Sequence, residues 1–104
     1  MGRELLPAEL IAATSRDKEV DDIVEVVLEL TGEIDWSSWH WIVRFKDGGF
    51  AHISAYLDIY GWTRIWDGAK TMEEALSICP ENVRKLFEDM LKNNEQVRMN
   101  NDCY

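Results

Sequence analysis

A β-hairpin near the middle of the chain constrains the fold more than any other feature of the sequence. Apolar side chains alternate with more polar ones over 39–46 and again over 50–57, and Asp47-Gly48-Gly49 between them has the composition of a turn. A period of two residues is typical of strands that bury one face. The sequence therefore predicts two antiparallel strands joined by a short loop.

The length of that loop decides which side chains share a face of the sheet. A two-residue loop at Gly48-Gly49 mixes polar side chains into the apolar face. A three-residue loop over 47–49 pairs Lys46 with Phe50 and keeps one face uniformly apolar, and Gly49 can adopt the left-handed conformation that such a loop requires. We therefore expect the three-residue loop, with an apolar face made of Trp39, Trp41, Val43, Phe45, Ala51, Ile53, Ala55 and Leu57.

Two helices are predicted before the hairpin. Pro7 suits the first turn of a helix that ends near Ser15. A longer helix is predicted over 17–31, because its apolar residues recur at helical spacing and Gly32 follows as a C-terminal cap. Most of these apolar residues are β-branched, which disfavours a helix slightly, but their spacing favours helix over strand. They are Val20, Ile23, Val24, Val27 and Leu28.

A third strand and two more helices are predicted after the hairpin. Thr71 and Glu74 have the spacing of a capping box, and Pro80 ends one helix and begins the next. The expected elements are a strand over 62–66, helices over 71–78 and 80–93, and a polar tail over 94–104.

Together these elements predict a single α+β domain over 1–93. Its expected order is α-α-β-β-β-α-α, in which a three-stranded antiparallel sheet carries the helices on its apolar face.

The chain is strongly acidic. Its formal net charge is −9, and residues 1–35 contribute −7 of this, with ten acids against three bases. Binding to nucleic acid or to an anionic membrane surface needs Lys and Arg, so both are poor candidates. The charge instead favours solubility or a basic partner protein, such as a component of a nucleic-acid-binding complex.

The remaining composition argues for a cytoplasmic protein that needs no cofactor. Cys79 and Cys103 have no metal or redox spacing and are expected to be reduced thiols. The N-terminal residues do not have the pattern of a signal peptide, and no apolar run is long enough to span a membrane.

No catalytic motif is present, so we expect no catalytic residue and no metal site. The sequence has no nucleophile elbow and no glycine-rich phosphate loop. In the predicted register His52 lies opposite Arg44 and His40 opposite Tyr56, which puts the two histidines about 13 Å apart. At that distance they cannot share a metal ion.

Acidic and aromatic residues form the two candidate binding surfaces. On the predicted helix over 17–31, Asp22, Glu25 and Glu29 fall on one ridge, which either faces solvent or engages a basic groove. Five tryptophans are unusual in a chain of 104 residues. If Thr63 and Ile65 join the core, the opposite face carries an aromatic and basic patch typical of interface hot spots. The candidate partner-binding residues are Asp22, Glu25, Glu29, Arg44, His52, Tyr56, Trp62, Arg64 and Trp66.

Two segments resemble a pattern in small phage and bacterial proteins of unknown function. These are Tyr56-Leu57-Asp58-Ile59-Tyr60-Gly61-Trp62 and Lys70-Thr71-Met72-Glu73-Glu74-Ala75-Leu76. The pattern joins an aromatic strand and Asp-x-x-Gly-Trp to a Thr-x-Glu-Glu-Ala helix. It often has Cys before the Asp, where this chain has Leu57. The resemblance implies a phage-like setting and transfers no activity.

Three functions are compatible with these features. The first is a non-enzymatic protein-binding module, for example a phage-type inhibitor of a host nucleic-acid-handling defence system, as an anti-CRISPR protein is. The second is a small enzyme or ligand binder that uses the sheet face through His52, Arg44, Tyr56 or Arg64. The third is a structural or regulatory protein that forms a homodimer through the sheet.

Overall fold

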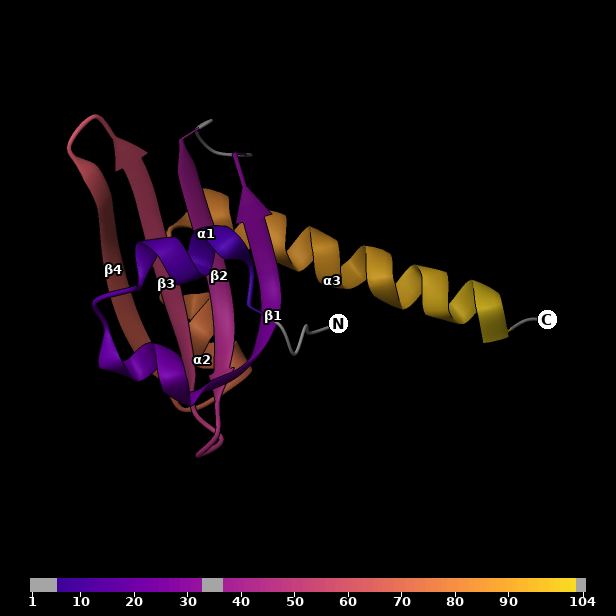
Figure 1. Ribbon diagram of the computed structural model, residues 1–104. Helices are drawn as coiled ribbons and strands as arrows, with labels where there is room; N and C mark the ends of the chain where they lie inside the picture. Colours follow the sequence, from indigo (N-terminus) through magenta and orange to yellow (C-terminus); the bar gives the residue numbers. More distant parts are fainter. Residues whose placement is uncertain (1–5, 33–36, 103–104) are drawn as a thin grey trace.

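The protein is an α+β domain built on a four-stranded antiparallel sheet with the strand order β1-β2-β3-β4 (Figure 1). The computed structural model describes residues 6–32 and 37–102, the last nine of them by their backbone only. The strands are β1 (Ile23–Thr31), β2 (Ser38–Phe45), β3 (Phe50–Asp58) and β4 (Gly61–Ala69). The prediction of an antiparallel sheet is confirmed, whereas the prediction of three strands is wrong.

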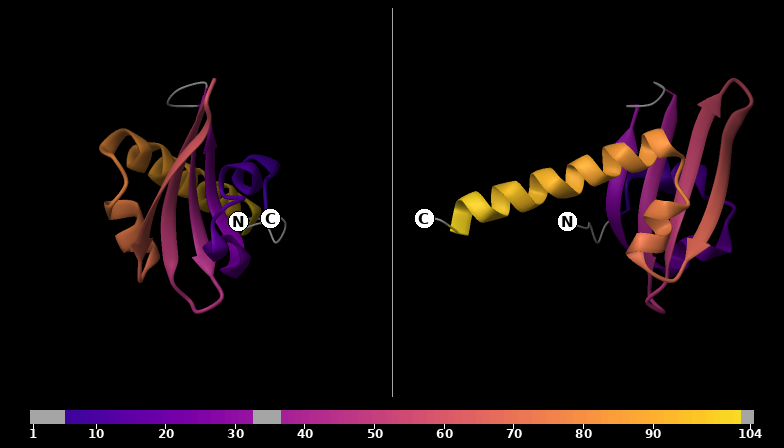
Figure 2. Two further views of the ribbon diagram at one scale, coloured as in Figure 1. Left: turned by 60° about the vertical axis from the view of Figure 1, so that its left-hand side comes forward. Right: turned by 180° about the vertical axis from the view of Figure 1, so that it is seen from behind.

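Helices cover both faces of the sheet, as Figure 2 shows. One face of the sheet packs against α1, and we call it the α1 face. The other face packs against α2 and α3, and we call it the α2/α3 face. The helical elements are α1 (Ala8–Ala13), the 3-10 helix η1 (Lys18–Asp22), α2 (Met72–Ser77) and α3 (Glu81–Asp102). The predicted placement of all helices on one face is therefore wrong, because both faces of the sheet carry buried apolar side chains.

Strand β1 replaces the long helix predicted over 17–31. Its register with β2 shifts twice, between Ile23 and Glu25 and again between Val26 and Leu28. As a result Ile23 and Val26 enter the core on the α1 face, whereas Leu28 enters the core on the α2/α3 face. These irregularities spread the apolar residues over both faces and imitate helical spacing. The β-branched side chains are the local signal that favours a strand.

The hairpin joins β2 and β3 in the predicted face pairing but in a register shifted by two residues. The loop is closed by Phe45 and Gly49, whose N–H and C=O groups are 2.8 Å apart, and Arg44 lies opposite Phe50. Gly48, with φ of 93°, supplies the left-handed residue that was expected at Gly49. The apolar face survives because a shift of two residues preserves the alternation.

Strand β4 places its large side chains on the α1 face. Trp62, Arg64 and Trp66 lie opposite Leu57, Ala55 and Ile53. The ring centroids of Trp39 and Trp62 are 4.8 Å apart, and those of Phe45 and Trp66 are 6.2 Å apart. Trp62, Arg64 and Trp66 therefore do not share a face with His52 and Tyr56.

Two helices follow the sheet. The predicted cap is present at the start of α2, where the Glu74 N–H donates to Thr71 Oγ1 over 3.1 Å. Val83 and Phe87 of α3 are fully buried against the sheet. The helical backbone of α3 continues beyond Asn93 to Asp102 and extends past the sheet (Figure 1).

Candidate functional site

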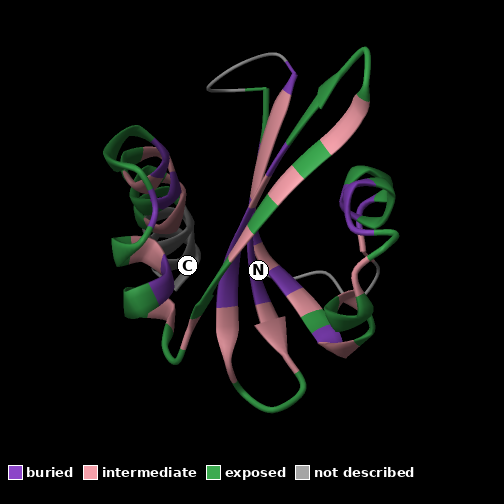
Figure 3. Cartoon of the chain, turned by 90° about the vertical axis from the view of Figure 1, so that its left-hand side faces the viewer, coloured by how far each residue is buried: buried purple, intermediate pink, exposed green. Residues whose placement is uncertain are grey.

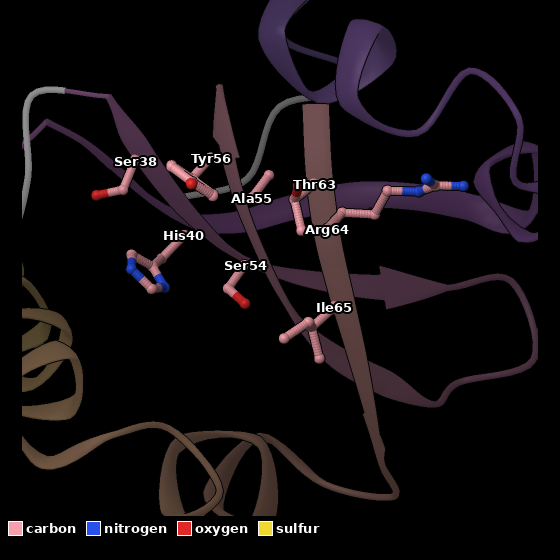
Figure 4. A pocket seen from close by; sticks show the side chains of 8 residues that line it. All are labelled: Ser38, His40, Ser54, Ala55, Tyr56, Thr63, Arg64 and Ile65. Carbon is pink, nitrogen blue, oxygen red and sulfur yellow. The ribbon is translucent and has the colours of Figure 1, made fainter. Parts of the chain in front are cut away.

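An open pocket of about 200 Å³ lies where α2 and α3 leave the α2/α3 face of the sheet uncovered. Strands β2, β3 and β4 line it with Ser38, His40, Ser54, Ala55, Tyr56, Thr63, Arg64 and Ile65 (Figure 4). The Arg64 side chain extends away from the other labelled side chains, toward the opposite face. The pocket therefore combines hydroxyl groups, one imidazole and the apolar side chain of Ile65.

Two histidines lie in direct contact beside this pocket. His40 Nδ1 and His52 Nε2 are 3.1 Å apart, and the two rings are within 6° of parallel. The predicted separation of about 13 Å is therefore wrong. The register shift explains the contact, because His40 now lies opposite Ser54 and His52 opposite Ile42.

Both imidazoles are held in the neutral form. Burial and, to a smaller extent, the neighbouring His40 lower the pKa of His52 to about 4, against an opposing effect of Asp67. Burial also lowers the pKa of His40. A neutral pair can share one N–H···N hydrogen bond, in which one ring donates and the other accepts. His52 is 2% exposed, and its Nδ1 has no hydrogen-bond partner among the described residues.

The tip of the β3–β4 hairpin exposes two large apolar side chains. Ile59 and Tyr60 are each 92% exposed. The turn is held by Asp58, which accepts the Tyr60 N–H over 2.8 Å and the Tyr56 hydroxyl over 3.1 Å. Gly61 follows with φ of 112°. We define Tyr56, Leu57, Ile59 and Tyr60, the exposed apolar side chains at the turn end of this hairpin, as the hairpin patch.

Ile59 and Tyr60 were not among the predicted partner-binding residues. Turns favour Gly, Pro, Asn, Asp and Ser. Two large apolar residues, Ile59 and Tyr60, at the central positions of the turn were therefore the sequence signal that could have indicated a binding site. Tyr56 is the only predicted partner-binding residue that belongs to the hairpin patch.

The three acidic residues of the predicted ridge do not lie on a helix together. Asp22 ends η1, whereas Glu25 and Glu29 belong to β1. Each contacts a neighbouring side chain: Asp22 contacts Lys46 at 3.0 Å, Glu25 contacts Arg44 at 2.9 Å, and Glu29 accepts the Trp41 indole N–H at 2.8 Å. Arg44 is therefore engaged by Glu25.

Arg64 and Trp66 hold the segment after α1 against β4. Arg64 donates to both carboxylate oxygens of Asp17, over 2.7 and 2.6 Å, and the Trp66 indole N–H donates to the same side chain over 3.1 Å. Arg64 and Trp66 lower the pKa of Asp17, against the opposing effect of burial. These contacts give both residues a structural role on the α1 face.

Other chemistry is sparse in the described residues. No group of three or more His, Cys, Asp or Glu side chains there is arranged to hold a metal ion. Cys79 is buried and free, and burial raises its pKa to about 11. Cys103 and Trp36 lie outside the described residues. No helix in the described part of the chain combines the length and hydrophobicity needed to cross a bilayer.

Comparison of the chain with protein-family models, curated proteins and solved structures finds no match.

Proposed function

We propose that this chain is a non-enzymatic protein-binding module that uses the hairpin patch as its anchor. The observation that carries the proposal is the 92% exposure of both Ile59 and Tyr60. Contiguous apolar side chains that project into solvent are typical of interaction surfaces, and tyrosine is enriched among interface hot spots. A partner with an apolar pocket would cover both side chains.

The rigidity of the turn supports binding by this tip. The two hydrogen bonds to Asp58 hold the turn in one shape before a partner arrives. Binding then costs less conformational entropy than it would for a flexible loop. The hairpin therefore presents Ile59 and Tyr60 as a preformed anchor.

The net charge of −9 supports a basic partner. Attraction between oppositely charged proteins accelerates their encounter, and salt weakens this attraction. We propose a partner from nucleic-acid-handling machinery, whose phosphate-binding surface carries Lys and Arg. Inhibition of a host defence complex of the anti-CRISPR kind is the setting in which the charge and the tip would act together.

Substitution of both tip residues tests this function. The variant with Ile59→Ser and Tyr60→Ser is expected to lose at least about 100-fold in affinity for a partner captured from bacterial lysate, because two hot-spot side chains are removed. Capture would be compared at low and high salt and followed by surface plasmon resonance. Ile11→Ser, an exposed apolar residue on α1, is the matched control. Equal binding by the tip variant and the wild-type protein would contradict the proposal.

A second candidate function is the binding of a small ligand in the pocket beside His40. The observation that favours it is the pocket of about 200 Å³ itself, which is lined by His40, hydroxyl groups and the apolar side chain of Ile65. Phenol is a suitable probe, because it offers an apolar ring and one hydroxyl group. NMR titration should shift the His40 and Ile65 signals of the wild-type protein, and His40→Ala should abolish the Ile65 shift. Shifts that persist in His40→Ala would exclude the pocket as the binding site.

A further inference from the structure

The two edges of the sheet differ in how they are protected. On β1, two register shifts and two acidic residues, Glu25 and Glu29, interrupt the edge. Irregular pairing and like charges are common devices against edge-to-edge association. The register between β3 and β4 instead runs without a shift from Asp58–Gly61 to Phe50–Ala69, and β4 contains no proline. Strand β4 is therefore the open edge.

Nothing in the described part of the chain covers this edge. Strand β4 is the last strand of the sheet. Figure 3 views the molecule from the β4 side, and the helices lie to the two sides of the strand without crossing it. Ile65, at the centre of β4, is 59% exposed although it is apolar and β-branched.

The sequence of β4 is complementary to itself in one antiparallel register. Pairing two copies about Ile65 places Ile65 against Ile65 and overlaps the whole of Gly61–Ala69. Arg64 then lies opposite Trp66 of the second copy, and Thr63 lies opposite Asp67 of the second copy. No two like charges face each other in this register, and the Thr63 hydroxyl can donate to the Asp67 carboxylate of the second copy.

Other registers are worse. The strand contains one basic and one acidic residue, Arg64 and Asp67. An axis at Arg64 or at Asp67 places two like charges directly opposite each other, which is destabilising. Any axis away from Ile65 also shortens the overlap and leaves more backbone N–H and C=O groups without a strand partner.

We propose that two copies of this chain associate through β4 to form one continuous antiparallel sheet. The occupant of the edge is a second copy because this register pairs β4 over its full length and places no like charges opposite each other. The contact is mainly one pair of strands, so it falls in the small interface class, below about 1,200 Å² of buried surface. The dimer is therefore expected to dissociate on dilution. The inference is independent of the proposed binding function.

The test exploits the pairing of residue 65 with itself. Sedimentation velocity over a concentration series should show the wild-type protein passing from monomer to dimer. Ile65→Lys and Ile65→Glu should each remain monomeric, because each places like charges opposite each other. An equimolar mixture of the two variants should recover the dimer, since Lys and Glu then face each other across the axis. Circular dichroism would show that each variant is folded.

The matched control is Val24→Lys, which changes an exposed β-branched residue on the other edge strand and should leave the dimer unchanged. A wild-type monomer at the highest concentration, or a mixture that stays monomeric, would overturn the proposal. A foreign peptide as the true occupant of the edge would appear as such a monomer. Ile65→Lys should keep the capture activity of the hairpin tip, and the tip variant should keep the dimer, so the two proposals can fail separately.

Discussion

Trp41→Ala is expected to lower the free energy of unfolding by about 3–5 kcal/mol, measured by urea denaturation. Trp41 is 0% exposed in the core of the α1 face, and its indole N–H donates to Glu29. The substitution leaves a large cavity and removes the hydrogen bond from the indole N–H to Glu29. The expected loss is a substantial part of the roughly 5–15 kcal/mol that typically stabilises a domain, so a large unfolded fraction is expected at 37 °C.

Trp41→Phe separates the two contributions. Phenylalanine cannot donate a hydrogen bond to Glu29, but it keeps an aromatic ring in the core. Because most of the buried volume remains filled, this variant should retain most of the stability. A loss below about 1 kcal/mol for Trp41→Ala would contradict the burial of this side chain, since core truncations of this size cost more.

Acidification is expected to destabilise the protein through His52. The pKa of His52 is about 4 in the folded chain, against an ordinary value of 6.5. Between these values the unfolded chain binds a proton that the folded chain excludes. The contribution of neutral His52 to the free energy of unfolding is therefore fully present above pH 6.5 and is lost as the pH falls toward 4. The expected loss by pH 4 is about 3 kcal/mol from this group.

His52→Leu isolates this effect. Carboxylates titrate in the same pH range in both proteins, so the difference between the two pH profiles of unfolding free energy reports the histidine. The profile of the variant should be flatter by about 3 kcal/mol between pH 7 and pH 4. An NMR titration in which His52 of the wild-type protein protonates near pH 6.5 would contradict the prediction.

Patterns in short segments of the sequence correctly predicted several elements of the fold. Alternation marked β2 and β3, and Thr71 with Glu74 marked the start of α2. The pairing of strands that are far apart in the sequence was harder to predict. The two register shifts in β1 disguise its strand character, and only pairing with β2 shows them.

The candidate site depended on the register. A shift of two residues preserves which face a side chain lies on, so the apolar face was predicted correctly. The same shift changes neighbours along the sheet, which brought His40 against His52. The exposure of Ile59 and Tyr60 also needed the structure, because a pair of apolar residues in a turn can equally fold back onto the core.

The sequence by itself determined the α+β class, the central hairpin and the acidic charge, because alternation, turn residues and charge are properties of short segments. The tertiary structure alone decided that β1 is a strand, that both faces of the sheet are covered, and that β4 is left as an open edge. These outcomes depend on contacts between residues far apart in the chain, because the pairing of strands decides which face of the sheet each side chain occupies.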